Sequence, residues 1–304
     1  MRSETTDGLD REWQGRSFPP VTATVERGRL RAFARATGQT DPVYFDLDAA
    51  RAAGHPDLLA PPTVLFFLAQ EDPALFSHLE AIGAAVSTVL HGAQTFRYHR
   101  AVHAGDELTL VTTIGRMWRS RDGRFDFAER HGAITDAATG RRVADSDDVL
   151  ITRLGSEPSP ERRDAKAETP LDPAQFTLHA PPVSRATLAM FAGASGDANP
   201  LHIDSDAARA AGLADVIAPG MLSMAYLGRL LTDAVRQEDL REFSVRFRAA
   251  TPVHAVPTCR GTLLDSPDAA GHRRFSLAVT LADGTTTLTG HAVVSGGLRG
   301  EGPR

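Results

Sequence analysis

The chain has 304 residues, of which 42% are hydrophobic and 23% are charged, and its formal net charge is −5. This length accommodates two domains of ordinary size, and the composition is typical of a soluble globular protein. The acidic balance gives no reason to expect nucleic acid or an anionic membrane as a partner. The one cysteine, Cys259, excludes an intramolecular disulfide and a cysteine-rich metal site.

The amino-terminal segment, MRSETTDGLDREW, is polar and lacks the apolar core of an export signal. No apolar run in the sequence approaches the length of a membrane span. We therefore expect a cytoplasmic protein without a membrane partner.

An internal repeat dominates the chain. A short β-like run from Val21 and a helix starting near Glu26 lead into residues 33–62, which are repeated at residues 191–220. The offset is 191 − 33 = 158, and 16 of the 30 aligned positions are identical without a gap. The chain is therefore an internal duplication.

The same pattern follows each copy. Residues 63–70 and 221–235 are apolar at helical spacing. Strand-like segments come next, separated by glycine-containing turns: 95–103, 107–114, 125–135 and 143–153 in the first half, and 243–253, 257–264, 274–281 and 285–294 in the second. A helix followed by several antiparallel strands indicates the α+β class. We expect one domain at 1–154, a proline-containing and charged linker at 155–172, and a second domain at 173–304.

The second copy carries an acid, an amide and an imidazole at short spacing, Asp197, Asn199 and His202. An Asp and a His brought together by a proline-containing turn can share proton transfer in one pocket. Gly220 stands at the start of the apolar helical segment. A glycine there can direct its backbone N–H at a developing oxyanion.

Residues that both copies share are expected to serve the fold. Asp46 and Asp204 correspond, as do Asp48 and Asp206, and each pair precedes an Ala-Ala-Arg-Ala-Ala-Gly run. They are interpreted as helix caps or first-turn acids. A metal cluster is the alternative, and it is disfavoured because two of its members have this structural explanation. Its four members would be Asp197, His202, Asp204 and Asp206.

The copies differ at the three chemical positions, where Gln39, Tyr44 and Pro62 correspond to Asp197, His202 and Gly220. Glutamine does not accept a proton at neutral pH, and tyrosine titrates near pH ~10. Proline has no N–H to donate. We therefore predict that the second copy alone carries the active site.

Taken alone, an Asp-x-Asn-Pro run is often only a turn, and a single histidine is usually structural. The joint presence of these groups in one copy favours catalysis. Ser195 and Asn199 are expected to orient the pair without reacting, and Cys259 is expected to be a small core residue. A structural role is expected for six other histidines: His55, His99, His103, His131, His254 and His272.

The second copy of the repeat, residues 191–220, resembles the hydratase motif of the MaoC-like family of (R)-specific enoyl-thioester hydratases and 3-hydroxyacyl-thioester dehydratases. The resemblance implies two tandem hotdog domains, each a long helix wrapped by an antiparallel sheet, which form a pseudo-dimer with a degenerate first domain. It also implies that Asp197 and His202 are the catalytic pair and that the Gly220 N–H binds the thioester oxygen. The matching residues are Phe191, Ser195-Gly196-Asp197, Asn199-Pro200, His202 and Ala218-Pro219-Gly220.

The expected function is that of a hydro-lyase acting on enoyl or 3-hydroxyacyl thioesters of coenzyme A or acyl carrier protein. We expect no metal or redox cofactor, and the expected partner is the thioester substrate. A homodimer of double hotdogs is compatible with the sequence, which does not determine the oligomeric state. Two alternatives stay open, a hotdog acyl-thioesterase and a non-catalytic acyl-thioester binding protein. Chain length, a carboxylated substrate, the carrier and the direction of reaction are not determined.

Overall fold

The computed structural model describes residues 8–84, 89–154, 175–264 and 269–299. Its centre is one antiparallel sheet of ten strands, in the order β1-β3-β4-β5-β2-β8-β12-β11-β10-β6. The first half contributes β1 (Val21–Thr24), β2 (Val89–Tyr98), β3 (Glu107–Arg119), β4 (Phe125–Asp136) and β5 (Arg142–Arg153). The second contributes β6 (Gln175–His179), β8 (Leu240–Phe247), β10 (Thr258–Leu264), β11 (Arg273–Thr280) and β12 (Thr286–Val294).

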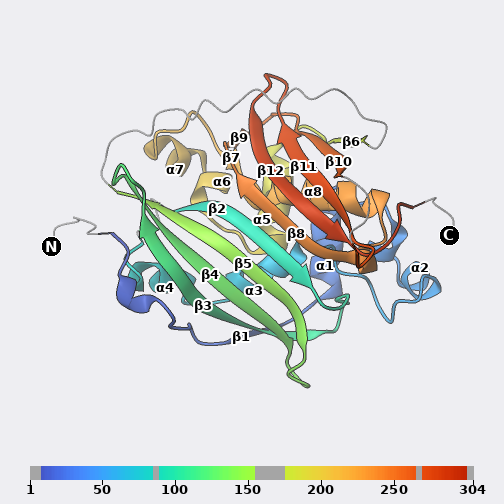
Figure 1. Cartoon of the computed structure of the whole chain (residues 1–304). Helices are drawn as coiled ribbons and strands as arrows, with labels where there is room; N and C mark the ends of the chain where they lie inside the picture. Colours follow the sequence, from blue (N-terminus) through green and yellow to red (C-terminus); the bar gives the residue numbers. More distant parts are fainter. Residues whose placement is uncertain (1–7, 85–88, 155–174, 265–268, 300–304) are drawn as a thin grey trace.

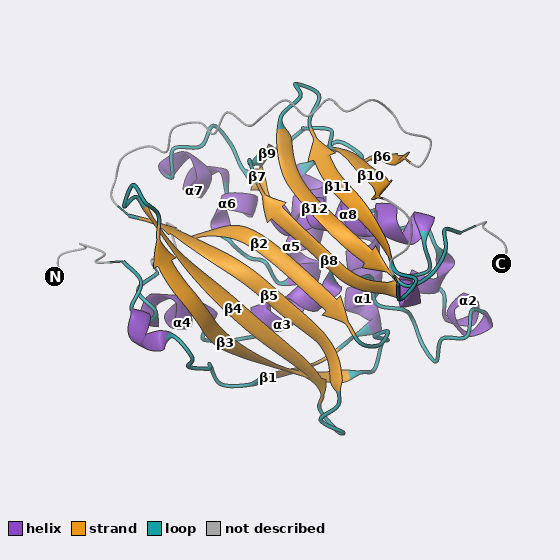
Figure 2. Ribbon diagram, viewed as in Figure 1, coloured by secondary structure: helices purple, strands orange, loops and turns teal. Residues whose placement is uncertain are grey.

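The two halves join where β2 pairs with β8, so that one sheet runs through the whole molecule (Figures 1 and 2). Phe96 lies opposite Phe243 in this pairing, and both are fully buried. The Thr95 and Ser244 hydroxyls are 2.7 Å apart across the same seam. Side-by-side pairing of equivalent sheets is the expected pseudo-dimer, and it confirms the predicted fold class.

The helices lie on one face of the sheet (Figure 2). Those of the first half are α1 (Arg27–Ala36), α2 (Leu47–Ala52), α3 (Phe67–Gln70) and α4 (Leu75–Ala81). Those of the second are α5 (Arg185–Ser195), α6 (Pro200–Ile203), α7 (Ser205–Ala210) and α8 (Gly220–Ala234). The equivalent helices α1 and α5 pack together, and the rings of Phe33 and Phe191 are 5.5 Å apart. The repeat thus contacts its own copy across the pseudo-twofold.

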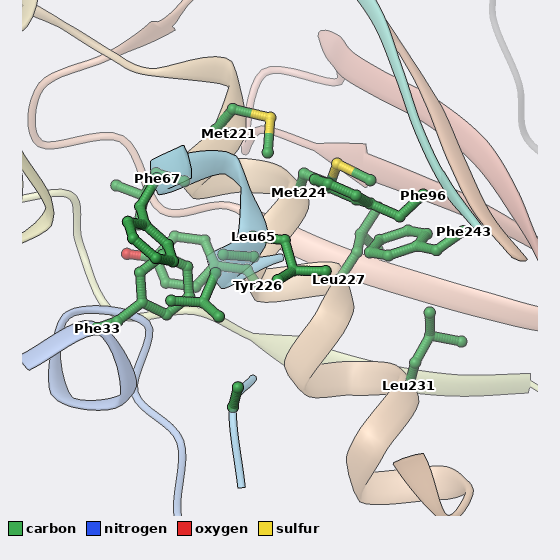
Figure 3. Packing of buried hydrophobic residues seen from close by; sticks show 14 of the residues in the cluster. Phe33, Leu65, Phe67, Phe96, Met221, Met224, Tyr226, Leu227, Leu231 and Phe243 are labelled. Carbon is green, nitrogen blue, oxygen red and sulfur yellow. The ribbon is translucent and has the colours of Figure 1, made fainter. Parts of the chain in front are cut away.

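Helix α8 is the long central helix of the second half. It is apolar almost all round, and eleven of its fifteen residues are buried. A helix of this kind belongs inside a core. Figure 3 shows its side chains Met224, Leu227 and Leu231 on the side where Phe96 and Phe243 lie. The helix therefore packs in the core where the two halves of the sheet meet, at the pairing of β2 with β8.

The corresponding helix of the first half is broken. A 3-10 turn, Val64–Phe66, leads into α3, which ends at Gln70, and α4 starts only at Leu75. Pro73 explains the break, because proline removes a helical N–H and disfavours helical backbone at the residue before it. Asp72 accepts a hydrogen bond from the Ala74 N–H across this turn. The first hotdog therefore has only a short helical segment where the second has fifteen residues.

Most predicted strands occur close to their expected bounds. The main differences are that β2 starts at Val89, before the expected 95, that β6 was not predicted, and that the segment 243–253 divides into β8 and β9 (Thr251–Pro252). Strand β9 pairs with β7 (Ile217–Ala218) in a separate two-stranded sheet. The predicted linker, 155–172, lies outside the described residues. Within the described residues, no helix is long and apolar enough to cross a membrane.

Candidate active site

The acidic turn begins where α5 ends. Gly196 caps this helix with a left-handed backbone, φ 78°, and its N–H donates to the Ala192 carbonyl. Glycine is the usual residue for this cap. A Cβ at Gly196 would also lie 2.8 Å from the Cβ of Gln70, at the end of α3. The turn therefore packs closely against the broken helix of the first half.

Ser195 and Asn199 hold this turn together. The buried Ser195 hydroxyl donates to the Phe191 carbonyl at 2.7 Å and accepts from the Asp197 N–H at 3.2 Å. The Asn199 side chain caps α6 by accepting from the Leu201 N–H at 3.0 Å. Both contacts fix the backbone on either side of Asp197.

Asp197 and His202 face each other without touching. The Asp197 Oδ2 and His202 Nε2 atoms are 4.0 Å apart, and the side chains are 16% and 13% exposed. This separation is too long for a direct hydrogen bond but can be bridged by one water molecule. The His202 Nδ1 lies 2.8 Å from the Ile217 carbonyl, which can only accept. Nδ1 therefore carries a proton, and Nε2 is the ring nitrogen that faces Asp197.

Gly220 is the first residue of α8. The preceding Pro219 contributes no side-chain cap to this helix start. The positive end of the helix dipole and its first-turn N–H groups are suited to an anionic oxygen. A Cβ at Gly220 would lie 2.6 Å from the ring of Phe247, so the close packing of β8 against the helix start requires glycine here.

These groups surround one cavity of about 2370 Å³, which is open to solvent and lined by both halves. From the second half it is lined by Asp197, Asn199, His202 and Gly220. The wall from the first half has an apolar part, formed by Phe66, Ala69, Leu75, Leu79 and Val89, and a charged part that includes Arg130 and Asp148. The structure thus brings the predicted pair and the predicted oxyanion donor to the same cavity.

The equivalent region of the first half is filled. Tyr44 is 1% exposed, and its hydroxyl donates to the Gln237 Oε1 at 2.7 Å. The Gln237 amide donates in turn to the Ala60 carbonyl. Burial raises the pKa of Tyr44 above its ordinary value. The cavity next to Pro62 is only about 280 Å³. Tyr44 is therefore a buried core side chain that is held in place by its hydrogen bond to Gln237.

The shared acids are caps, as predicted. Asp46 accepts from the Ala49 N–H, and Asp204 accepts from the N–H groups of Asp206 and Ala207. The Asp206 side chain is 92% exposed in the first turn of α7. No group of three His, Cys, Asp or Glu side chains within the described residues is arranged to hold a metal ion. Cys259 is fully buried, as expected of a core residue, and burial raises its pKa to about 12.

One residue of this cavity was missed by the sequence analysis. His91 of β2 lines the cavity, and its ring stacks near that of Phe66 and is tilted against that of Phe247. A single histidine ahead of the expected strand start at 95 gives no signal. Only the extension of β2 and a bulge in it bring His91 to the site.

The fold and the site define a protein of two fused hotdogs with an acid–imidazole pair in the second. A family model described as a MaoC like domain matches residues 165–262, and one described as a FAS1-like dehydratase domain region matches residues 12–146. A UPF0336 protein of Streptomyces coelicolor is 40% identical over 151 residues, which are 49% of this chain and 98% of that protein. One from Streptomyces griseus is 39% identical over 150 residues, with shares of 49% and 98%.

The solved structures agree in fold. A MaoC-like dehydratase has a TM-score of 0.77 at 23% identity, over 93% of this chain and 98% of that one. A conserved hypothetical protein of Mycobacterium tuberculosis, described as a double hotdog, has a TM-score of 0.66 at 17% identity, over 95% and 97%. This chain belongs to the MaoC-like family in its double-hotdog form, with the FAS1-like dehydratase region first and the MaoC-like domain second.

Proposed function

We propose that the protein is a hydro-lyase that adds water to enoyl thioesters, or removes it from (R)-3-hydroxyacyl thioesters, of coenzyme A or acyl carrier protein. The observation that carries this proposal is the 4.0 Å separation of Asp197 and His202 at a cavity that also contains the start of α8. The match to a MaoC-like domain supports the reaction class. Water addition leaves the net oxidation state unchanged, so the reaction requires no redox cofactor.

In the hydration direction, one water bridges Asp197 and His202. Its oxygen forms a bond to C3 of the enoyl group, and its proton passes to the pair. The pair returns a proton to C2, so that both additions occur on one face. General acid–base catalysis of this kind contributes about 10²- to 10⁴-fold in rate.

The negative charge of the intermediate develops on the thioester oxygen. We propose that the Gly220 N–H and the dipole of α8 stabilise this enolate. A preorganised oxyanion donor contributes about 10²- to 10³-fold. The fixed tautomer of His202 supports the same orientation, because its Nε2 faces Asp197.

The first half supplies the wall for the acyl chain. Its broken helix leaves an apolar surface beside the pair, formed by Phe66, Ala69, Leu75, Leu79 and Val89. An acyl chain bound there buries apolar surface on both sides, which contributes roughly 0.8 kcal/mol per methylene group. The site therefore needs both halves, although only one carries the reacting side chains. The predicted domain boundaries, a cytoplasmic location and a homodimer of double hotdogs remain predictions.

Hotdog proteins also include hydrolases. A 12:0-ACP thioesterase of Umbellularia californica shares the fold with a TM-score of 0.53 at 11% identity, over 91% of this chain and 93% of that one. Incubation with crotonyl-CoA separates the two reactions. Hydration removes the enoyl absorbance without releasing free thiol, whereas hydrolysis releases thiol.

We expect hydration, with a product that an (R)-specific 3-hydroxyacyl-CoA dehydrogenase consumes and an (S)-specific one does not. Release of thiol at the rate of enoyl loss would identify a thioesterase. If crotonyl-CoA and longer trans-2-enoyl-CoA esters all stay intact, the hydro-lyase proposal is wrong.

A further inference from the structure

The inner face of the first half is polar at a level of the sheet where the second half is apolar. In each half, three paired residues of neighbouring strands form this level. They are Gln94, Asp148 and Arg130 in the first half, and Phe243, Ala292 and Phe275 in the second. The two rows correspond, because Gln94 and Phe243 each precede one member of the contact between Thr95 and Ser244 at the seam. All three side chains of the second row are fully buried.

Asp148 and Arg130 point to the same side as the core residues of their strands. Alternate residues of a strand share a face, and the buried Leu150 and Ala128 lie two positions away in β5 and β4. The Asp148 Oδ2 accepts from the Arg130 Nε at 2.9 Å and lies 2.8 Å from its Nη2. A single charge on this face would be unfavourable, and these contacts compensate both charges. The row is therefore polar without a net charge.

The cavity reaches this ion pair beside the broken helix of the first half. Both side chains line the cavity, and they are 18% and 11% exposed. Ala69 and Leu75, on either side of the break after Gln70, line the same cavity. In the second half the fifteen-residue helix α8 covers the equivalent row, and the Cβ position of its Gly228 is 3.7 Å from the ring of Phe243. The break in the first half thus leaves the ion pair accessible from the cavity.

The ion pair is close to the catalytic pair. Desolvation lowers the pKa of His91, and the charges of Asp148, Arg130 and Asp197 act on the same ring with smaller effects. All four of these side chains line the one cavity. The apolar wall of the first half and the ion pair are therefore both within reach of a substrate bound at Asp197.

We propose that the acyl chain extends toward the Arg130–Asp148 pair and that this pair limits its length, so that the protein acts on short-chain thioesters. The proposal rests on the proposed hydro-lyase function and names its substrate class. An alkyl chain gains free energy when it is buried against the apolar wall. A longer chain covers the ion pair and removes water from two charges without a hydrogen bond in return, which is unfavourable. A terminal carboxylate gains no ion pair either, because Asp148 already neutralises Arg130.

The test is the dependence of kcat/KM on chain length in the full-length protein. The substrates are crotonyl-CoA and the trans-2-hexenoyl, octenoyl, decenoyl and dodecenoyl esters. We expect the wild-type kcat/KM to be highest for the crotonyl or hexenoyl ester and at least about tenfold lower for the decenoyl ester. Binding of the saturated acyl-CoA esters of the same lengths, measured by calorimetry, should follow the same order.

Removing both charges together should remove the limit. Arg130→Met/Asp148→Leu replaces the pair by apolar side chains of similar volume, whereas a single substitution would leave one charge unpaired in the wall. This variant should raise the ratio of decenoyl to crotonyl kcat/KM by at least about tenfold, which corresponds to the burial of roughly two methylene groups.

The matched control is Arg116→Gln/Glu129→Gln, which removes an ion pair of 3.3 Å. Glu129 precedes Arg130 in β4 and therefore lies on the opposite face of the sheet. The control should keep the wild-type ratio. A ratio between two substrates of one variant does not depend on the fraction of folded protein, so a loss of stability alone cannot change it.

The results separate this inference from the hydro-lyase proposal. If wild-type protein hydrates no enoyl ester, the hydro-lyase proposal fails and the binding series decides about the ion pair, with tighter binding of the longer esters overturning the limit. If wild-type protein hydrates long esters as well as short ones, the hydro-lyase proposal stands and the limit is wrong. An unchanged ratio in folded Arg130→Met/Asp148→Leu also overturns the limit.

A second variant decides the outcome if the apolar one does not fold. Arg130→Gln/Asp148→Asn removes both charges but keeps polar side chains that can bond to each other. Because neutral groups cost less to desolvate than charged ones, its ratio should rise by at least about threefold. A wild-type ratio in this folded variant would contradict the role of the two charges.

Discussion

Asp197 and His202 are held by different means. His202 is fixed through its ring, which donates to the Ile217 carbonyl. Asp197 is fixed within its turn, where its N–H donates to the Ser195 hydroxyl and its Oδ1 accepts from the Asn199 N–H at 3.4 Å. The two side chains therefore keep their 4.0 Å separation without bonding to each other. A pair arranged in this way can hold a water and exchange protons with it, which is the chemistry that hydration needs.

At the residue scale, Asp197→Asn and His202→Ala should each lower kcat by at least about 100-fold with the fold intact. The double variant should be little worse than the poorer single one, because both side chains act on one water. The kcat of each variant is measured with crotonyl-CoA, and circular dichroism checks that its fold is intact. Asp206→Asn is the matched control at a 92% exposed carboxylate and should keep wild-type turnover. A variant of either residue that retains a tenth of the rate would remove that residue from the catalytic role.

His91 predicts a specific dependence of stability on pH. Desolvation lowers the pKa of His91 in the folded protein, with a smaller opposing effect from the charge of Asp148, and the positive charge of Arg130 lowers it further. In the unfolded chain, histidine has a pKa of about 6.5, so on acidification the unfolded chain binds a proton at a higher pH than the folded protein does. The contribution of His91 to the unfolding free energy is therefore fully present above that pH and is lost as the pH falls below it. One unit below this pKa, at about pH 5.5, the loss is at most roughly 1.4 kcal/mol.

Urea unfolding at pH 7.5 and 5.5 measures this loss. His91→Gln should show a smaller decrease in unfolding free energy between these two pH values than the wild type. An equal decrease in His91→Gln and wild type would show that His91 titrates normally in the folded protein.

At the scale of elements, the site depends on the junction between α5 and α3. Gly196 ends α5 in the left-handed region, and Gln70 occupies the space beside it. The same junction joins the two halves, since α3 belongs to the first and α5 to the second. A change at Gly196 should therefore act on both the fold and the position of Asp197.

Gly196→Ala should lower the unfolding free energy by about 1–2 kcal/mol through backbone strain, with an added contribution from contact with Gln70. Gly212→Ala is the matched control, because Gly212 has a φ of 85° but nothing within 4 Å of its Cβ position. Thermal unfolding and kcat of both variants make the comparison. Equal stability and equal kcat in the two variants would mean that the contact with Gln70 has no role.

The sequence predicts the helices and strands better than it predicts the breaks and register shifts within them. Periodicity identifies α8 from Met221 to Val235, and the repeat identifies the caps Asp46 and Asp204. The helical run of the first half is interrupted after Gln70, because Pro73 forms a turn before α4 starts at Leu75. The orientation of His91 depends on a bulge between paired strands, and such a register shift has no signature in a single strand.

At the scale of the molecule, two copies of one unit have divided their roles. In the second copy the acid and the imidazole face a cavity, whereas in the first copy Tyr44 is bonded to Gln237 from the other half. Through this hydrogen bond, the position that corresponds to His202 becomes part of the interface between the two halves. The first half still contributes to this cavity, because its broken helix and β2 line it.

The most direct test of this division is crotonyl-CoA turnover of Gln39→Ala/Tyr44→Phe beside Asp197→Asn, in proteins shown to be folded. We expect the double variant in the first copy to keep turnover near wild type, since neither side chain lines the cavity that contains Asp197 and His202. We expect the single change in the second copy to abolish it. Loss of turnover in a folded Gln39→Ala/Tyr44→Phe protein, or wild-type turnover in Asp197→Asn, would contradict the assignment of the active site to the second copy.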